Sequence, residues 1–239
     1  MRFHKNINTY NKQYKLLKHS IIMEARSDDK KAMLESVRAY LSEFSHDNEK
    51  INSIIDAMDK IDRKNFINDE YKKYAYLDQA IPSEKTQTIS QPSTVARMLL
   101  LLNLNQKDNV LEIGAGTGWS CALIGFIVKH GYVKGLEIVD KLREKAIERI
   151  NKQGLNNVEI KRDDFRNLND TYDKIVFTAG INMSQEKFIE EFAKEHLKEN
   201  GRLICPFQFG PMLIFDKTQE RLEKTTTQEH YAFVPLVLD

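Results

Sequence analysis

The sequence predicts an α/β fold in which helices cover both faces of a mostly parallel sheet. From residue 92 onward, short apolar runs of strand length alternate with runs of helix length, as in chains built from strand–helix–strand units. A glycine-rich turn stands between the first such strand and the helix that follows it. The last two strand-like runs follow each other with no helix between them, which predicts an antiparallel hairpin at the end of the chain.

The elements of this sheet are expected in a regular order. Gly131, Gly154 and Gly201 mark the expected ends of three helices, because glycine readily adopts the left-handed conformation that closes a helix. The expected helices are residues 118–131, 141–154 and 184–201. The expected strands are residues 109–116, 132–138, 157–162, 172–180, 202–207, 211–217 and 230–238. This order is typical of a Rossmann-like methyltransferase sheet rather than of a plain dinucleotide-binding sheet.

Helical spacing also marks the region before the sheet. Apolar residues recur on one face in each of two stretches between residues 30 and 61, with Asp47 or Asn48 as the expected N-cap of the second helix. We therefore expect an N-terminal arm followed by one methyltransferase domain with two parts. The expected bounds are 1–30 for the arm, 31–239 for the domain, 31–91 for its helices and the polar loop that follows them, and 92–239 for its sheet.

The composition excludes several classes of function. The formal net charge of the 239-residue chain is +1, with acids and bases spread through it, so no basic surface predicts a nucleic-acid partner. No apolar run reaches the roughly 18 residues that a membrane helix needs. Cys121 and Cys205 stand in apolar surroundings, which predicts two reduced core thiols and a cytoplasmic protein. The six histidines lack metal-ligand spacing, so no metal site is expected.

The amino terminus differs from the rest of the chain. The first 19 residues contain five lysines and arginines and no acid, and no signal-peptide core follows them. We interpret this stretch as a loosely held arm, which is the usual fate of a polar terminus. The alternative is an arm that binds a partner or a nucleic acid.

The glycine-rich turn indicates which ligand the sheet binds. Gly114, Gly116 and Gly118 follow a strand directly, but Trp119 stands where a dinucleotide fingerprint has its third glycine. Glu137 closes the second strand and provides a carboxylate that accepts hydrogen bonds from ribose hydroxyls. Asp163 closes the third strand at the same edge of the sheet. A cofactor with ribose and adenine but no phosphate fits this pattern, which points to S-adenosylmethionine.

From about Ile51 to its end, the chain resembles the protein-L-isoaspartate O-methyltransferase family. The resemblance begins with "AMDKIDRKNFI", which contains Arg63 and Phe66, and continues through "YAYLDQAIP". The segment "TQTISQP" looks like the family's substrate loop, with Thr88, Ser90 and Pro92 as its core. "VLEIGAGTGW", "GLEI", "YDKIVFTAG", "GRLICP" and "FVPLV" complete the order. The glycine turn is common to many methyltransferases, whereas "TISQP" together with "FVPLV" is more specific.

The resemblance implies a substrate, a reaction and a set of site residues. Enzymes of this family methylate the free α-carboxylate of isoaspartyl residues in damaged proteins and peptides, and the ester then closes to a succinimide that reopens partly to aspartate. The resemblance implies that Ser90 and Thr88 are catalytic. The implied cofactor-binding residues are Gln87, Gly114, Ala115, Gly116, Gly118, Glu137, Ile138, Asp163 and Asp164.

The role of Ser90 has two interpretations at this stage. Pro92 suits the first turn of a helix, so that Ser90 or Gln91 would be the N-cap. A helix N-terminus attracts a carboxylate, and the hydroxyls of Ser90 and Thr88 would add fixed hydrogen bonds to it. In the other interpretation Ser90 only caps the helix.

The chain departs from the family pattern in two places. Thr86 stands where the family usually has glycine, and Arg162-Asp163-Asp164 replaces a Gly-Asp-Gly sequence, so that Arg162 and Asp164 would pair with each other or narrow the pocket. Two alternatives to repair stay open: a maturation enzyme that esterifies an aspartate of a specific peptide, and a binding protein without turnover. A nucleic-acid methyltransferase is disfavoured, because "FTAG" after the fourth strand lacks a base-reading motif.

Overall fold

The computed structural model describes residues 29–84 and 87–237, so Thr86 and nearly all of the expected arm lie outside the described residues. The chain divides into two compact units, residues 1–97 and 98–239, with the division inside helix α4 (Pro92–Leu102). The first unit holds the N-terminal helices and the "TISQP" segment, and the second holds the glycine turn and the sheet. Among the described residues, no helix is long and apolar enough to span a membrane.

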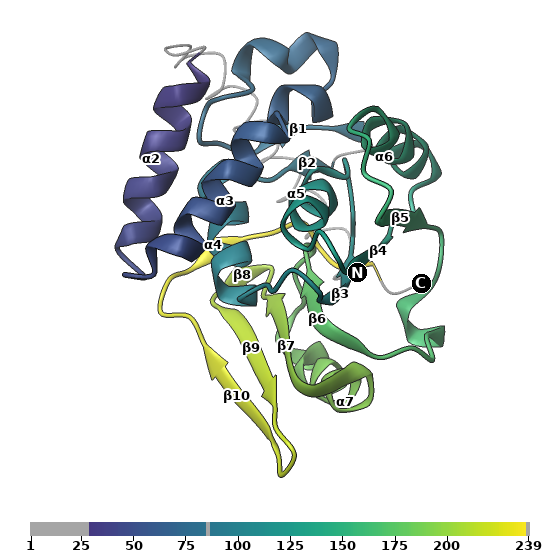
Figure 1. Ribbon diagram of the computed structural model, residues 1–239. Coiled ribbons are helices and arrows are strands. Elements are labelled where there is room, and N and C mark those ends of the chain that lie inside the picture. The colour runs from purple at the N-terminus through teal and green to yellow at the C-terminus, as the bar shows by residue number, and fades with distance from the viewer. Residues whose placement is uncertain (1–28, 85–86, 238–239) are drawn as a thin grey trace. The chain divides into compact units, whose positions relative to one another are not determined.

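Two antiparallel helices, α2 (Lys30–Ser42) and α3 (Asn48–Lys60), begin the first unit (Figure 1). Each helix begins at an aspartate, because a carboxylate accepts the amide protons that the first turn leaves unpaired. Asp29 accepts from the amide of Lys31 at 2.9 Å, and Asp47 accepts from the amide of Lys50 at 3.1 Å. The predicted pair of helices and the predicted Asp47 cap are therefore confirmed.

The remainder of the first unit is a compact loop region with little regular structure. Two short 3₁₀ helices, η1 (Arg63–Phe66) and η2 (Asp69–Tyr74), follow α3. Strand β1 (Ile81–Pro82) then pairs antiparallel with β2 (Thr88–Ile89), with Ile81 opposite Ile89. The chain enters α4 at Pro92, as predicted from the proline at the first helical position.

The second unit is built on a seven-stranded sheet. Its strands, in spatial order, are β10 (Leu222–Thr226), β9 (Met212–Lys217), β7 (Leu197–Pro206), β6 (Tyr172–Phe177), β3 (Asn109–Ile113), β4 (Tyr132–Leu136) and β5 (Val158–Lys161). Strands β7, β6, β3, β4 and β5 run parallel, whereas β9 and β10 are antiparallel to their neighbours. The chain order reverses beside β3, which is where doubly wound sheets bind their ligands. The predicted mostly parallel sheet is confirmed.

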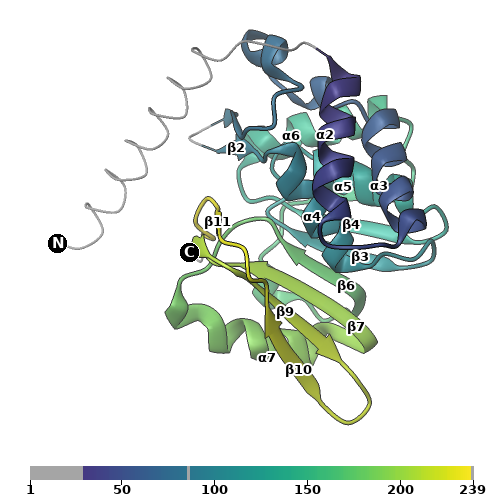
Figure 2. The ribbon, with the colours of Figure 1, turned by 90° about the vertical axis from the view of Figure 1, so that its left-hand side faces the viewer.

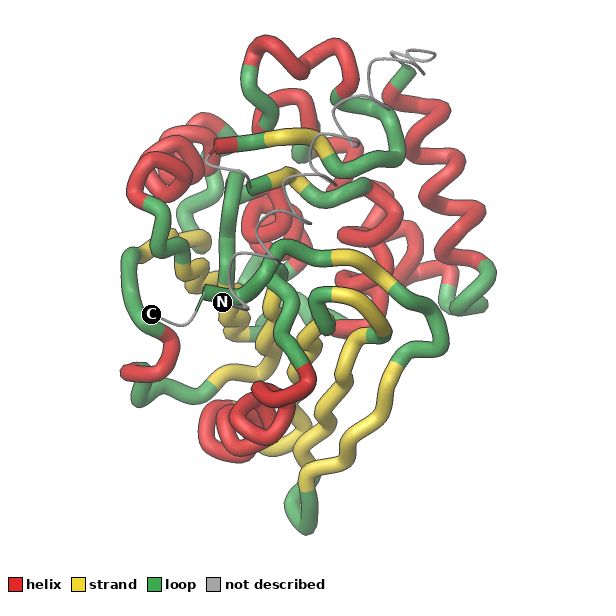
Figure 3. Tube along the Cα trace, turned by 180° about the vertical axis from the view of Figure 1, so that it is seen from behind, coloured by secondary structure: helices red, strands yellow, loops and turns green. Residues whose placement is uncertain are grey.

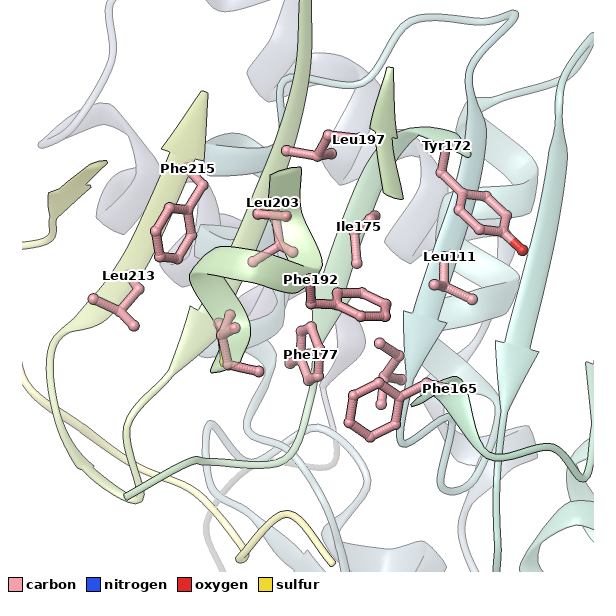
Figure 4. Packing of buried hydrophobic residues seen from close by; sticks show 14 of the residues in the cluster. Leu111, Phe165, Tyr172, Ile175, Phe177, Phe192, Leu197, Leu203, Leu213 and Phe215 are labelled. Atoms are coloured by element: carbon pink, nitrogen blue, oxygen red, sulfur yellow. The ribbon is translucent and has the colours of Figure 1, made fainter. Parts of the chain in front are cut away.

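Helices cover both faces of this sheet. Helices α5 (Trp119–Ile127) and α6 (Asp140–Lys152) connect β3 to β4 and β4 to β5 and lie on one face, and α7 (Glu186–His196) lies on the other (Figure 2). Right-handed crossovers produce this arrangement when the strand order turns back on itself. Under α7, edge-to-face rings of Phe165, Phe177 and Phe192 pack with aliphatic side chains of the strands (Figure 4). Cys121 and Cys205 are buried free thiols, as predicted.

The terminal hairpin differs from the prediction. We expected residues 230–238 to pair with residues 211–217, but β9 pairs instead with β10, which the charged sequence "LEKTT" did not suggest. The hairpin is visible as two long yellow strands in Figure 3. Residues 231–232 form the short strand β11 beside β8 (Phe209–Gly210), and the amide of Leu236 donates to the carbonyl of Gly180. Exposed polar side chains on an edge strand carry little periodic signal, which explains the error.

Two helix ends also differ from the prediction. Helix α5 ends four residues before Gly131, because the side chain of Asn157 donates to the carbonyls of Gly125 and Val128 at 3.0 Å each and satisfies that end. Helix α7 ends at His196, and β7 begins directly at Leu197, with an irregularity in its pairing to β6 where Asn200 has a φ of 61°. Only Gly154, with a φ of 71°, closes its helix as expected.

Candidate active site

The glycine turn connects β3 to α5 at the carboxyl edge of the sheet. Gly114, Gly116 and Gly118 have φ values of 91°, 55° and 86°, a region that side chains rarely adopt. The amides of Gly114 and Ala115 both donate to the carbonyl of Leu136 at 2.9 Å, which ties the turn to the end of β4. The turn is therefore a fixed part of the sheet edge.

Glycine is required at positions 118 and 116 for two different physical reasons. A Cβ on Gly118 would approach the Cβ of Ala146 to 3.1 Å, so this glycine allows α5 and α6 to pack closely. A Cβ on Gly116 would meet only the carbonyl of Gly114 at 3.7 Å, so this position faces open space. Open space beside a backbone that only glycine tolerates fits the close approach of a ligand.

Glu137 lies directly after β4 and holds the turn from the side. Its Oε2 accepts from the amide of Gly116 and its Oε1 from the amide of Val139, each at 2.8 Å. Burial raises the pKa of Glu137, while these amides oppose the shift. A carboxylate has about four acceptor positions, so these amides leave acceptor capacity on Glu137 for a ribose hydroxyl. The predicted carboxylate is present, and it has a second role as a support for the turn.

A second acid, Glu112, lies on β3 two residues before the turn and was not predicted as a site residue. It is fully buried, and its Oε1 accepts from the hydroxyl of Ser120. Burial raises the pKa of Glu112 to about 7, against the opposing effects of Cys121 and Ser120. Among the described residues, Oε2 has no hydrogen-bond partner. An unsatisfied buried acceptor beside the turn fits a cofactor that carries positive charge.

The residues after β5 depart from the prediction. Arg162 pairs with Asp140 across 3.3 Å, whereas Asp164 accepts from the amide and guanidinium of Arg166, so the suggested pairing of Arg162 with Asp164 is wrong. Asp163 is exposed and accepts from the amide of Asp164. Ile138, at the end of β4, is 44% exposed, which leaves an aliphatic surface next to Glu137.

The first unit contains the "TISQP" segment, which the family resemblance predicts to bind the methyl acceptor, and we call this region the acceptor half of the chain. Thr88 and Ser90 are half-buried on either side of the buried Ile89. Because successive side chains of an extended strand point to opposite faces, Thr88 and Ser90 share the face opposite Ile89. Among the described residues, the Ser90 hydroxyl makes no hydrogen bond, so it is available to a substrate. Gln87 closes a turn, in which its amide donates to the carbonyl of Glu84 at 2.9 Å.

The amino end of α4 confirms Gln91 at the N-cap position, but the capping hydrogen bond differs from the prediction. Asp78, rather than Ser90 or Gln91, accepts from the amide of Ser93 at 2.8 Å. Gln91 occupies the N-cap position but donates its side-chain amide to the Ser93 hydroxyl at 2.7 Å. The interpretation in which Ser90 only caps the helix is therefore wrong. The proposed use of this helix end as the holder of a substrate carboxylate is weakened, because Asp78 already places a carboxylate there.

The strand order, the glycine turn after β3 and the acid after β4 together define an S-adenosylmethionine-dependent methyltransferase of the Rossmann-like class. A family model described as protein-L-isoaspartate(D-aspartate) O-methyltransferase matches residues 30–239. The chain belongs to the protein-L-isoaspartate (D-aspartate) O-methyltransferase family.

Relatives and solved structures agree with this assignment. A protein-L-isoaspartate O-methyltransferase of Fervidobacterium nodosum is 35% identical over 77% of this chain and 92% of its own length. One of Pyrococcus abyssi is 35% identical over 74% of this chain and 83% of its own length. A solved protein-L-isoaspartate O-methyltransferase, 26% identical, superposes with a TM-score of 0.70 over 85% of this chain and 66% of that chain. A Plasmodium falciparum structure described as a complex with S-adenosyl-L-homocysteine has a TM-score of 0.71 at 20% identity, over 88% of this chain and 99% of that chain, and supports the fold.

Proposed function

We propose that the chain transfers a methyl group from S-adenosylmethionine to the free α-carboxylate of isoaspartyl residues in damaged proteins and peptides. The family match carries this proposal, because residues 30–239 include both the acceptor half with Thr88 and Ser90 and the cofactor half with Glu137. The methyl ester that results closes to a succinimide, which reopens partly to normal aspartate.

The cofactor half fits S-adenosylmethionine on the geometry of its own residues. Glu137 would accept from the ribose hydroxyls, Gly116 would let the backbone approach, and Glu112 would face the charged part of the ligand. Ile138 and Asp163 would border the adenine ring. The cofactor supplies a methyl group on a positively charged sulfur, so two buried acids beside the turn are electrostatically favourable.

The acceptor half requires positioning rather than proton transfer. A carboxylate is already ionised near neutral pH, since its reference pKa is about 4, so no general base is needed. Ser90 and Thr88 would donate hydrogen bonds to the carboxylate and orient one oxygen for attack. Well-oriented reactants recover roughly 7–11 kcal/mol of a barrier, which makes this orientation the main task of the chain.

A pair of matched peptides tests the proposal. The protein is incubated with S-adenosylmethionine and with two peptides that differ only in isoaspartate or aspartate at one position, and base-labile methyl esters are counted. We expect esters on the isoaspartyl peptide alone. Esters on neither peptide would contradict the proposal.

A second candidate function is the esterification of an aspartate in a specific peptide partner. Residues 1–29 precede the family match, and the first 19 contain five lysines and arginines and no acid, so an arm outside the shared domain could bind an acidic partner. Esters on the aspartyl peptide, or activity that disappears when residues 1–29 are removed, would favour this candidate.

We also propose a cytoplasmic location. Cys121 and Cys205 are buried and unpaired, as is usual in a compartment that keeps thiols reduced. The substrates would then be the ageing proteins of that compartment. Fractionation of cells with an antibody to the chain would test the location.

A further inference from the structure

A buried arginine lies at the centre of the acceptor half. Arg63, from η1, is 1% exposed, and its guanidinium donates to backbone carbonyls of residues that are distant in sequence. Nη1 donates to Ala75 at 2.7 Å and to Leu77 at 3.3 Å, and Nη2 donates to Gln79 at 2.9 Å and to Ser90 at 3.0 Å. The side chain therefore joins the loop 75–79 to the residue that carries the candidate catalytic hydroxyl.

Only an arginine is suited to this position. Its guanidinium presents donors in a rigid planar fork, whereas lysine presents one ammonium on a flexible stem. Burial lowers the pKa of Arg63 to about 9, against the opposing charge of Asp78. A buried charge is unfavourable unless it is hydrogen-bonded, and the four carbonyls accept from both terminal nitrogens of the guanidinium. Removal of the side chain would leave these carbonyls without their donor.

Asp78 approaches the same segment from the solvent side. It stands between the carbonyl groups of Leu77 and Gln79 that Arg63 binds, and its own carboxylate is exposed. Oδ1 accepts from the amide of Ser93 at 2.8 Å, and Oδ2 lies 3.4 Å from the side-chain nitrogen of Gln91. Ser90 is thus held through its carbonyl by Arg63, and Ser93, three residues later in the first turn of α4, is held through its amide by Asp78.

We propose that Arg63 and Asp78 are positioning residues for methyl transfer, which orient the Ser90 hydroxyl by fixing the backbone on both sides of it. This inference rests on the proposed function and assigns a role to two residues that do not themselves touch substrate. The backbone of Ser90 fixes the direction of its Cα–Cβ bond, and with it the region that the hydroxyl can reach.

Arg63→Lys is the direct test, with Arg38→Lys as the matched control. Arg38 donates to Asn52 at 2.6 Å on the surface of the α2–α3 pair, so its replacement leaves the acceptor segment intact. We expect Arg63→Lys to lower kcat/KM on an isoaspartyl peptide about 100-fold, the loss typical of a small misplacement. Cofactor affinity, measured by equilibrium dialysis, should stay within about twofold. The four residues that accept hydrogen bonds from Arg63 are not among the predicted cofactor-binding residues.

Asp78→Asn is the second variant, since Arg63→Lys could fail to fold. Asp47→Asn is its matched control, because Asp47 caps α3 and its carboxylate makes a hydrogen bond and an ion pair with Lys50. Asp78→Asn should lower kcat/KM about 10-fold, while Asp47→Asn should leave it within about twofold. Asp78→Glu should restore part of the loss, because it returns the negative charge.

A double-mutant cycle distinguishes positioning from general stability. If Asp78 acts through Ser90, Asp78→Asn should lower kcat/KM by no more than about threefold in a Ser90→Ala background, because coupled residues are not additive. The same loss in both backgrounds, or a parallel loss of cofactor affinity, would contradict the proposal.

Amide hydrogen exchange tests the inference without any activity. Asp78→Asn should increase exchange in residues 88–95, whereas Asp47→Asn should increase it only at the start of α3. Unchanged exchange in residues 88–95 would overturn the positioning role. If the wild-type protein exchanges as expected but methylates no isoaspartyl peptide, the proposed function fails and the structural role of Asp78 stands.

Discussion

The cofactor half and the acceptor half organise irregular backbone with charges of opposite sign. In the cofactor half, the buried carboxylate of Glu137 accepts hydrogen bonds from the amides of Gly116 and Val139. In the acceptor half, the buried guanidinium of Arg63 donates hydrogen bonds to the carbonyls of four residues, Ser90 among them. Each charge lies where the backbone leaves regular structure and its polar groups would otherwise be unpaired.

The difference in sign suits the ligands proposed for the two halves. A cofactor with a positively charged sulfur is favoured beside Glu112 and Glu137, and the positive charge of Arg63 favours the approach of a substrate carboxylate to the acceptor half without contact. The comparison indicates that Glu137 in one half and Arg63 in the other each have two effects. Each side chain holds irregular backbone in place, and each contributes to the local electrostatic potential. The predictions below separate these two contributions, from the largest expected effect to the smallest.

Glu137→Gln should weaken the binding of S-adenosylhomocysteine about 100-fold. The variant replaces one acceptor oxygen by a donor that faces a backbone amide, and an unsatisfied buried group costs about 1–3 kcal/mol. Calorimetric titration would measure the affinity. Glu159→Gln, at a half-buried carboxylate on β5, is the control and should bind normally. Normal binding by Glu137→Gln would show that this acid neither supports the turn nor holds the ribose.

Ser90→Ala should lower kcat/KM on an isoaspartyl peptide about 30-fold, since hydrogen bonds to charged groups contribute about 1.5–3 kcal/mol. Cofactor affinity should not change, because Ser90 belongs to the acceptor half. Ser53→Ala, an exposed serine of α3, serves as the control. Turnover within about twofold of wild type would remove Ser90 from the proposed mechanism.

The stability of the protein should depend on pH through Glu112. Its pKa is raised from 4.5 to about 7 in the folded chain, so between these values the folded state binds more protons than the unfolded state. The stabilisation is therefore present at low pH and is lost as the pH rises through 7. Relative to Glu112→Gln, the wild type should lose about 2 kcal/mol of unfolding free energy between about pH 5.5 and 8.

Urea denaturation at both pH values, with the variant measured in parallel, would test this pH dependence. An equal difference between wild type and Glu112→Gln at the two pH values would contradict the raised pKa. Tighter cofactor binding above pH 7 in the wild type alone would support an electrostatic role for the ionised Glu112.

Arg162→Ala should have the smallest effect. The Arg162–Asp140 pair is more than half exposed on both sides, and exposed pairs contribute about 0–1 kcal/mol. Cofactor affinity should stay within about twofold of wild type, and Arg166→Ala, which removes the partner of Asp164, provides the comparison. A gain of about tenfold in affinity would instead show that Arg162 narrows the adenine side of the pocket.

Residues in regular, buried elements were the most predictable. Buried apolar runs identified the five parallel strands, and the glycines at 114, 116 and 118 located the turn because their backbone conformation excludes other residues. The edge strand β10 was missed, because its polar exposed sequence has no alternation to detect. The end of α5 was misplaced, because Asn157, which satisfies it, lies 29 residues after Val128 in the chain.

The sequence by itself determined the fold class, the glycine turn, Glu137 and the acceptor segment, since each depends on local patterns or on motifs of adjacent residues. Only the tertiary structure decided what holds them: the amide of Gly116 on Glu137, Asp78 at the start of α4 and the four carbonyls on Arg63. Buried polar groups must find partners, and those partners come from wherever the fold brings the chain together. The spacing of residues along the chain does not indicate which distant residues will provide those hydrogen-bond partners.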